Sequence, residues 1–376
     1  MNYAKLFLQS KKVYSFPKRN NILIYDDINY NYLKSNYKNI DFGLLEARGK
    51  TFNLPILIIS IFYSFYKKKN LKLSYFYNYV KFVKPKFLIT FFDNNVFFYS
   101  LSTKLKLNIP SIKTISYQNG LRQNNKGDIF DLMGPSKILS CDYIFTLSKS
   151  YNSLYKTRIR SEIIDAGSFK SNELLIHHSN IKFKYTFISQ LENFQKNSTN
   201  FLNDNLCLFY KSENHLLNYL NSANFIKDHD INILLRSDLP EEQNYFNNIF
   251  KTKKINFIKK SINFQETYNI IDRSDIVITI DSTLGIEAIS RNIKTIFIST
   301  RCFYNNVQSS KFGWPIEYTD IGPFWTNQPD NKEYDKIFKN IINIDLKEWS
   351  MLLKNYTEII SRDFKNKKFF KLINHR

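Results

Sequence analysis

Short apolar runs alternate with longer helical patterns along nearly the whole chain, and this alternation limits the possible folds more than any other feature. Short apolar strands separated by helices are typical of a parallel sheet that is covered on both faces. The helical patterns fill most of the gaps between the runs. The runs that we predict to be strands are 21–26, 41–47, 87–92, 111–117, 142–147, 185–189, 231–236, 255–258, 276–280 and 295–299.

The alternation pauses once, at the polar stretch 166–180, and then resumes. A chain of 376 residues is long for one domain and suits two. We therefore predict an α/β protein with two Rossmann-like, doubly wound parallel-sheet domains that face a cleft. The predicted domains are residues 1–170 and 171–376, with the option that the last helices cross back to the first lobe.

The formal net charge is +21, which suits nucleic acid, an anionic membrane surface or an anionic substrate. The lysines are spread along the chain, and the sequence contains no RNA-binding signature, zinc knuckle or helix-turn-helix pattern in which they are concentrated. We predict no nucleic-acid partner and keep peripheral contact with an anionic inner membrane open.

Several common chemistries have no motif in this sequence. The three cysteines are far apart, and the five histidines form no HExxH, so we predict neither disulfides nor a metal site. His177 and His178 fall in the expected linker. The patterns GxGxxG, GxxxxGK[ST] and GxSxG are absent, which argues against dinucleotide, P-loop and serine-hydrolase sites.

The first residues contain no long apolar core, so we expect no signal peptide. The most apolar stretch, Leu54–Tyr66, is shorter than the roughly 20 residues that span a bilayer. We expect a buried helix there and a cytoplasmic protein.

The segment 274–288 carries the strongest site signal. An apolar strand ends at Ile280, and a helix is expected to begin at Ser282 or Thr283, where free N–H groups and hydroxyls could bind a phosphate. Gly285 would let the backbone approach a ligand or the sheet, and Glu287 could hold the hydroxyls of a ribose. The alternative is an ordinary helix N-cap with Glu287 on the surface.

With this loop and six further motifs, the chain resembles surface-carbohydrate (O-antigen, lipopolysaccharide) biosynthesis proteins and, more loosely, the C-terminal lobes of GT-B glycosyltransferases. The resemblance covers about 21–374 and implies a GT-B fold and a bacterial sugar-polymer pathway, without fixing the sugar. The motifs are Asp281–Glu287, Thr295–Ser299, Asp93-Asn94-Asn95, Gln118-Asn119-Gly120, Gly167-Ser168, Gly313-Trp314-Pro315 and Gly322–Trp325.

Residues that follow strands are the other candidates, because ligands bind beyond the carboxyl ends of parallel strands. On the donor side we predict that Ser189 and Gln190 lie near the phosphates and that Arg236 pairs with one of them. Ordinary turns and a strand-end salt bridge are the alternatives.

On the acceptor side we predict Asp93 as the catalytic base, with Asp26, Asp27 and Glu46 as weaker candidates. An ordinary Asn-rich turn is the alternative. Side chains expected to bind a sugar or phosphate are those of Gln118, Asn119 and Arg122.

The predicted activity is transfer of a sugar from a nucleotide-sugar to a lipid-linked or oligosaccharide acceptor, with no cofactor. A UDP-N-acetylglucosamine 2-epimerase-like enzyme, a glycerophosphate- or ribitol-phosphate-type transferase and a non-catalytic nucleotide-sugar-binding scaffold are alternatives. Trp314 and Trp325 could stack on a sugar or base, although we favour packing at the lobe interface.

Overall fold

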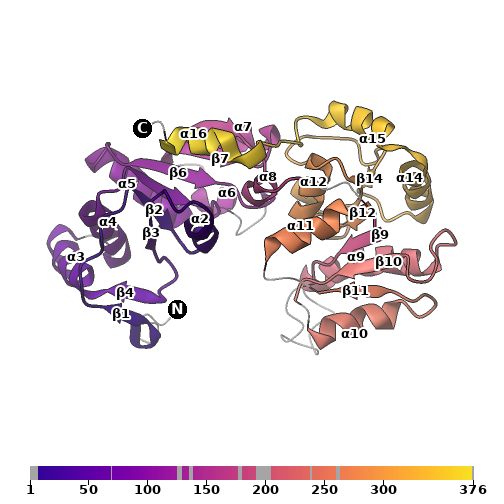
Figure 1. Cartoon of the computed structure of the whole chain (residues 1–376), viewed down its shortest axis with the longest axis horizontal. Coiled ribbons are helices and arrows are strands. Elements are labelled where there is room, and N and C mark those ends of the chain that lie inside the picture. Colours follow the sequence, from indigo (N-terminus) through magenta and orange to yellow (C-terminus); the bar gives the residue numbers. More distant parts are fainter. Residues whose placement is uncertain are drawn as a thin grey trace.

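The computed structural model describes residues 7–68, 70–124, 129–134, 139–176, 180–191, 205–237, 239–259 and 263–374. These residues form two α/β lobes that lie side by side (Figure 1). Each lobe is built on a six-stranded sheet in which all neighbouring strands are parallel. The predicted fold class, two doubly wound parallel-sheet lobes, is confirmed.

The first sheet has the strand order β3-β2-β5-β6-β7-β8. Apolar residues on alternate strand positions pack against α2 and α16 on one face and against α4, α5 and α7 on the other. The strands and helices of this lobe, in chain order, are β2 (Ile22–Tyr25), α2 (Tyr30–Asn36), β3 (Phe42–Leu45), α3 (Leu54–Lys67), α4 (Leu71–Val83), β5 (Phe87–Thr90), α5 (Val96–Asn108), β6 (Lys113–Tyr117), α6 (Ile129–Met133), β7 (Leu139–Thr146), α7 (Asn152–Arg158), β8 (Ile159–Asp165) and α16 (Lys367–Asn374).

The second sheet has the order β11-β10-β9-β12-β13-β14, the strand order 3-2-1-4-5-6 of dinucleotide-binding Rossmann folds. One face packs against α11 and α12, and the other against α9, α10 and α14. Its elements are β9 (Phe183–Ile188), α9 (Asn205–Ser222), β10 (Ile231–Leu234), α10 (Pro240–Ile249), β11 (Asn256–Ile258), α11 (Phe264–Asp272), β12 (Ser274–Thr279), α12 (Thr283–Ser290), β13 (Lys294–Ile298), α13 (Arg301–Asn305), β14 (Trp325–Thr326), α14 (Asn331–Asn343) and α15 (Leu346–Leu353).

Two segments connect the lobes and run close to each other, one between β8 and β9 and one between α15 and α16 (Figure 1). The outgoing segment contains α8 (Phe169–Glu173). The Asn172 side chain donates to Asn366 Oδ1 over 3.0 Å, and Asn366 donates to the Phe169 carbonyl over 2.9 Å. At Gly167, a Cβ atom would lie 2.3 Å from the Ser361 carbonyl oxygen, so only glycine lets the two segments pass this closely.

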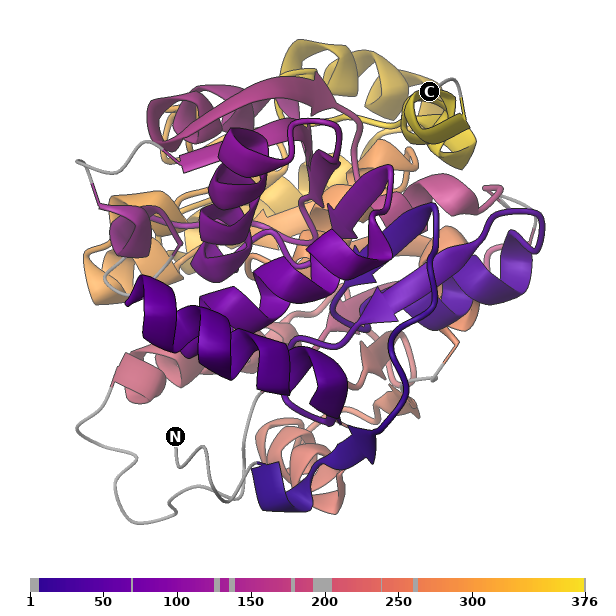
Figure 2. The ribbon, with the colours of Figure 1, turned by 90° about the vertical axis from the view of Figure 1, so that its left-hand side faces the viewer.

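The returning segment places α16 on the first sheet, although α16 follows the whole second lobe in the chain (Figures 1 and 2). Phe369 of α16 is fully buried, and its ring lies about 6 Å from four aromatic rings of the first lobe. These rings belong to Phe91, Tyr117, Phe145 and Phe169. The core of the first lobe is therefore completed by the returning helix.

The sequence did not predict β8, β14 or the small sheet formed by β1 and β4. β8 alternates charged and apolar residues, with Arg160 and Glu162 exposed, and it follows directly on α7, which ends at Arg158. β14 has only two residues, and β1 (Lys11–Val13) pairs with β4 (Thr51–Asn53) in a separate two-stranded sheet. Such short or edge strands bury too little apolar surface to give a periodic signal.

The helix predicted at Leu54–Tyr66 is present, but the prediction that it is buried is wrong. Helix α3 forms there, and Asn53 caps it by accepting a hydrogen bond from the Ile56 N–H, but only Ile56 and Ser60 within α3 are buried. Its outer face carries exposed apolar side chains, among them Phe65 at 89% exposure. Among the described residues, no helix has both the length and the apolar composition needed to cross a membrane.

Candidate functional site

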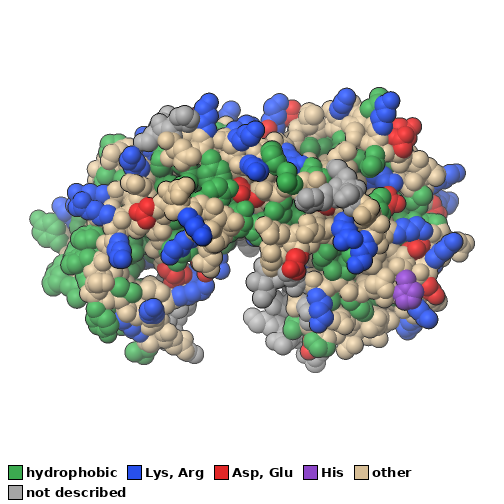
Figure 3. Space-filling model, viewed as in Figure 1, with side chains coloured by type: hydrophobic (Ala, Val, Ile, Leu, Met, Phe, Trp, Pro, Cys, Tyr) green, Lys and Arg blue, Asp and Glu red, His purple; other side chains and the backbone are tan. Residues whose placement is uncertain are grey.

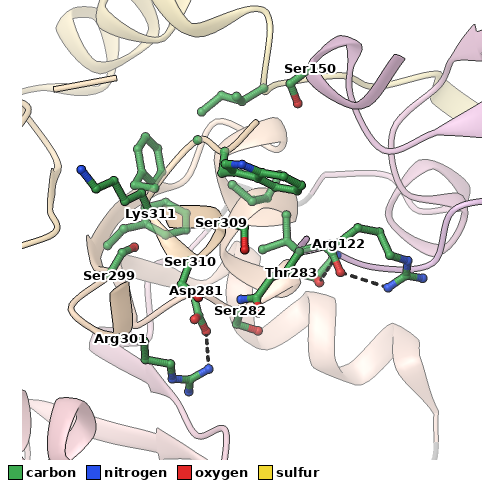
Figure 4. A pocket seen from close by; sticks show the side chains of 18 of the residues that line it. Arg122, Ser150, Asp281, Ser282, Thr283, Ser299, Arg301, Ser309, Ser310 and Lys311 are labelled. Carbon is green, nitrogen blue, oxygen red and sulfur yellow. Dashed lines mark hydrogen bonds and ion pairs between the residues drawn. The ribbon is translucent and has the colours of Figure 1, made fainter. Parts of the chain in front are cut away.

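The second sheet changes winding direction between β9 and β12, and a cavity of about 390 Å³ opens at the carboxyl ends of these strands. Gln190, which follows β9, and Asp281, which follows β12, both line it. Ligands of open α/β sheets bind at such switch points. The opposite wall comes from the first lobe, through Arg122, Ser150 and other residues (Figure 4).

A largely buried ion pair, which we call the floor, lines this cavity. Arg301, at the start of α13, donates to Asp281 Oδ1 over 2.7 Å, and Gln190 Nε2 donates to the same oxygen over 3.1 Å (Figure 4). Asp281 Oδ2 is buried and has no hydrogen-bond partner among the described residues. Burial lowers the pKa of Arg301, while the charges of Asp281 and Glu213 oppose that shift. The floor thus joins the ends of β12 and β13.

Glu213 of α9 lies behind this floor with its side chain fully buried. Burial raises the pKa of this carboxyl to about 8, Arg301 acts in the opposite direction, and the nearby Glu242 and Asp281 add to the increase. Neither carboxyl oxygen has a hydrogen-bond partner in the described part of the chain. Burial therefore favours the neutral, protonated form of the Glu213 carboxyl beside the Asp281–Arg301 pair.

Hydroxyl groups and an aromatic side chain form the cavity's rim. Lys311 and Trp314 lie on the loop after α13, and Trp314 meets Tyr151 of the first lobe at a ring distance of 6.3 Å. Trp314 thus lies at the lobe interface, whereas Trp325 is buried in the second lobe's core. The hydroxyl groups belong to Ser148 and to residues labelled in Figure 4, namely Ser150, Ser282, Thr283, Ser299, Ser309 and Ser310.

The helix start at Ser282–Thr283 lines this inter-lobe cavity, as its strand-to-helix position predicts. Its amides, however, are largely engaged within the protein: Asp281 N–H donates to Gln190 Oε1, and Ser282 N–H donates to Thr279 Oγ1. The Leu284 N–H donates to the Ser282 side-chain oxygen and the Gly285 N–H donates to the Ser282 carbonyl. Four amides of this turn are therefore engaged by protein oxygens, and phosphate binding by the turn stays a prediction. The Ser282 and Thr283 side chains do line the cavity, and Thr283 Oγ1 accepts from the Leu121 N–H across the lobes over 3.0 Å.

Two further residues of the predicted loop lie away from the cavity. A Cβ atom on Gly285 would lie 2.6 Å from Thr279 Cγ2, so this glycine lets α12 pack closely on the sheet, which is the second of its two predicted roles. Glu287 is buried, accepts a hydrogen bond from Tyr268 over 2.9 Å and is bonded by Ser168. Burial raises the pKa of Glu287, whose partners are protein side chains rather than an open ribose site.

Among the remaining donor-side residues, two line the cavity and one does not. Arg236 lines the cavity beyond β10, and its guanidinium donates to the Gln190 carbonyl over 3.4 Å. Ser189 is buried and donates to Glu242, which also accepts from the Arg236 and Ser237 amides. Gln190 and Arg236 thus face the cavity, and Ser189 supports the turn behind them.

Asp93, the predicted catalytic base, does not line the cavity. Its side chain is fully buried, and Arg122 forms a two-pronged ion pair with it, one contact being Nε to Oδ2 at 2.7 Å. Tyr155 donates to Oδ2 and the Asn119 N–H donates to Oδ1. With both oxygens occupied by protein donors, Asp93 holds Arg122, and Arg122 is the one of the two that lines the cavity.

The other first-lobe candidates also have structural partners. Gln118 is buried and bridges the Gly120 carbonyl and the Leu147 N–H. Asn119 is exposed, and its side-chain oxygen accepts from Arg122. The weaker base candidates lie outside the cavity lining: Asp26 and Asp27 pair with Arg48 and Lys50, and Glu46 accepts backbone N–H bonds.

In the described ranges, no group of three or more His, Cys, Asp or Glu side chains is placed to hold a metal ion. His177 and His178 lie outside the described residues.

The sequence patterns pointed to Asp281 only as the start of a motif and did not point to Arg301 or Glu213. Arg301 could have been found, because it follows β13 as closely as the other candidates follow their strands. Glu213 shares a helix face with the buried Leu216, Leu217 and Leu220. Acidic side chains are rarely buried, so an acid on such an apolar face indicates a structural or functional role.

The family comparison extends over most of the chain. Residues 115–376 match a family described as "putative O-antigen biosynthesis protein". No curated protein sequence matches the chain.

Solved structures similar to this chain share its GT-B-type architecture. The wall teichoic acid polymerase TagF, soaked with CDPG, has a TM-score of 0.53 at 11% identity, covering 95% of this chain and 89% of TagF. The UDP-GlcNAc 2-epimerase from Neisseria meningitidis, bound to UDP-GlcNAc, has a TM-score of 0.52 at 11% identity, covering 94% and 99%. An epimerase-type protein from Listeria monocytogenes has a TM-score of 0.53 at 9% identity, covering 95% and 96%. At these identities the likeness concerns the fold.

Proposed function

Because the chain belongs to the O-antigen biosynthesis protein family, we propose that it is a glycosyltransferase of bacterial surface-polysaccharide synthesis. In this proposal it transfers a sugar from a nucleotide-sugar to a lipid-linked or polymer acceptor. The observation that carries the proposal is the cavity between the lobes, which lies at the switch point of the second sheet. Its volume of about 390 Å³ is within the range of small-molecule sites.

The chemistry of the cavity lining supports an anionic donor. Arg122, Arg236, Arg301 and Lys311 line it, whereas Asp281 is the only carboxylate among the described lining residues. Guanidinium groups bind phosphate oxygens through paired hydrogen bonds. The ring of hydroxyl groups would bind further phosphate or sugar oxygens.

Sugar transfer forms a bond between an acceptor oxygen and the anomeric carbon and breaks the bond from that carbon to the donor phosphate. The nucleotide leaves with the electron pair of the broken bond, and the acceptor hydroxyl gives its proton to solvent water. In our proposal Arg236 and Arg301 stabilise the charge that grows on the leaving phosphate, without a metal ion. Asp281, as the partner of Arg301, is a positioning residue.

The proposal places the enzyme in the cytoplasm beside the inner membrane, where it meets a lipid-linked acceptor. The net charge of +21 supports such contact, because anionic lipids attract basic surfaces.

A thermal-shift screen with UDP-, GDP-, CMP- and dTDP-sugars tests the donor site, since a ligand that binds only the folded state raises Tm. We expect one nucleotide class to raise Tm of the wild type. Arg236→Gln should weaken that ligand roughly 10- to 100-fold, the effect of losing one hydrogen bond to a charged group. Arg160→Gln, an exposed arginine on β8 of the first lobe, is the matched control and should bind as the wild type does. A screen without any shift, or equal binding by Arg236→Gln, would contradict the proposal.

An epimerase-like activity is the second candidate, because the UDP-GlcNAc-bound epimerase shares the fold over 99% of its length. Incubation with UDP-GlcNAc and no acceptor separates the two, since only an epimerase converts the sugar alone. TagF, soaked with CDPG, shares the fold over 89% of its length at a TM-score of 0.53. A transferred phosphate-linked group is therefore the third case to assay, with CDP-glycerol as donor.

A further inference from the structure

Helix α3 presents a continuous apolar face to solvent at the outer end of the first lobe (Figures 1 and 3). We call these residues the α3 face. Their positions follow the i, i+3, i+4, i+7 spacing that places side chains on one side of a helix. The members, with their exposed fractions, are Ile58 (55%), Ile59 (44%), Ile61 (48%), Phe62 (72%), Phe65 (89%) and Tyr66 (80%).

The opposite side of α3 already packs on the lobe. Ser60 is fully buried and accepts a hydrogen bond from Asn78 of α4 over 3.0 Å. Tyr63 stacks on Tyr77 of α4 at 6.1 Å between ring centroids. Helix α3 therefore packs on the lobe without using the α3 face. Exposed apolar patches of this kind mark interaction surfaces.

The charges around the α3 face indicate what it contacts. Residues 54–83, which comprise α3, α4 and their connection, contain five lysines and no aspartate or glutamate. Lys67 and Lys68, at the end of α3, are exposed, and Figure 3 shows Lys and Arg side chains beside the hydrophobic ones at this edge. The lysines of the segment are Lys67, Lys68, Lys69, Lys72 and Lys81.

We propose that the α3 face is a membrane-docking surface that binds a bilayer containing anionic phospholipids. Helices that lie in a bilayer interface combine a Phe- and Leu-type apolar face with lysines that contact head groups. With 14 residues, α3 is too short to span a bilayer and suits a position along its surface. This assignment does not depend on the reaction proposed above.

Charge also argues against a second copy of the chain as the occupant. A two-fold pairing of α3 faces would bring the exposed Lys67 and Lys68 of both copies together. Like charges repel, and no acidic residue within 54–83 could offset them. An anionic bilayer, in contrast, complements both the apolar and the basic part of the surface.

The docked orientation leaves the candidate site accessible. Helix α3 lies at the end of the first lobe that points away from the second lobe (Figures 1 and 2). The inter-lobe cavity is lined by other segments of the first lobe, 121–123 and 148–151. Membrane contact through α3 therefore does not block the cavity.

Co-sedimentation of the full chain with vesicles tests this surface. We expect binding to vesicles of phosphatidylcholine with about one third phosphatidylglycerol and weak binding to phosphatidylcholine alone. The double variant Phe62→Ser/Phe65→Ser should lose at least about tenfold in partitioning at every salt concentration, because it removes two inserting rings. Lys67→Gln/Lys68→Gln should weaken binding at low salt only.

Phe303→Ser is the matched control, because Phe303 is a 60% exposed phenylalanine on the second lobe. It should bind vesicles as the wild type does, and circular dichroism should show that all variants fold. The proposal is overturned if the wild type binds neither vesicle, or if Phe62→Ser/Phe65→Ser binds like the control. It is also overturned if the lipid-free wild type is a dimer that this double variant dissociates.

Discussion

Arg291 should be one of the most stability-sensitive residues of the chain. Arg291 caps the C-terminus of α12, and its fully buried side chain forms a two-pronged ion pair with the equally buried Asp272, with Nε 2.6 Å from Oδ1. The same guanidinium donates to carbonyls of the segment that leaves the first lobe, Ser171 at 3.0 Å and Leu175 at 2.9 Å. One side chain thus ties this segment to the second lobe.

Arg291→Met keeps most of the side-chain volume but leaves the Asp272 carboxylate buried without its counter-charge. Breaking a buried ion pair from one side costs roughly 3–5 kcal/mol, and the orphaned carbonyls add to that. For a lobe of this size, about 1 kcal/mol lowers Tm by about 2–4 °C. We therefore expect Tm to fall by roughly 6–20 °C.

The chain itself supplies a selective probe of this unfolding. All three tryptophans lie C-terminal to the strands of the first lobe in the sequence. Trp325 and Trp349 are buried in the second lobe, and Trp314 lies at the interface. Urea unfolding followed by tryptophan fluorescence therefore reports on the second lobe, while far-UV circular dichroism reports on both. We expect the fluorescence transition to move to lower urea in Arg291→Met.

Arg273→Met is the matched control, because Arg273 follows Asp272 directly but is partly exposed. Within the described part of the chain, its side chain forms one long hydrogen bond, 3.5 Å, to the Asn180 carbonyl. It should change the free energy of unfolding by less than about 0.5 kcal/mol. Adding Asp272→Asn to Arg291→Met should recover part of the loss, since no buried charge then remains unpaired. If Arg291→Met lost less than about 1 kcal/mol, the reasoning from buried charge would be refuted.

Two further predictions follow from buried carboxyl groups. Asp93→Asn should destabilise the first lobe by roughly 3–5 kcal/mol, because Arg122 keeps its charge and loses its partner; a Tm equal to that of the wild type, together with lost turnover, would instead restore Asp93 as a base. Glu213 has a pKa of about 8 in the folded protein, against 4.5 for an ordinary glutamate. As pH rises, the unfolded chain therefore loses this proton before the folded protein does. The free energy of unfolding falls between about pH 4.5 and pH 8, by up to roughly 5 kcal/mol in total. Glu213→Gln removes this loss, so its Tm should match that of the wild type at pH 5 and exceed it at pH 8 to 9; parallel Tm profiles for the two proteins would contradict the assignment.

The order of strands and helices could be predicted because most strands are fully buried apolar runs, such as Ile276–Ile280, that end in polar residues. The same periodicity could not show that β8, with its exposed Arg160 and Glu162, is a sheet edge. Nor could the composition of α3 show which of its faces is buried, because the helix is apolar on both sides.

The position of the candidate site could also be predicted, since the rule for switch points depends only on strand order and on which residues follow each strand. It led to Gln190, Arg236 and the Ser282–Thr283 turn, all of which line the cavity. The roles suggested for Asp93 and Glu287 failed the geometry, because their partners Arg122 and Tyr268 lie 29 and 19 residues away in the chain. A pairing over such distances is decided by tertiary packing.

The return of α16 to the first sheet constrains how the polypeptide matures during synthesis. The ribosome must produce the entire second lobe before residues 367–374 emerge, so until then the groove that receives Phe369 stays uncovered. Aromatic surface left open in a half-made chain is a target for chaperones and for aggregation. A deletion that removes this helix should therefore harm the half of the molecule made first, even though every residue of that half's sheet is retained.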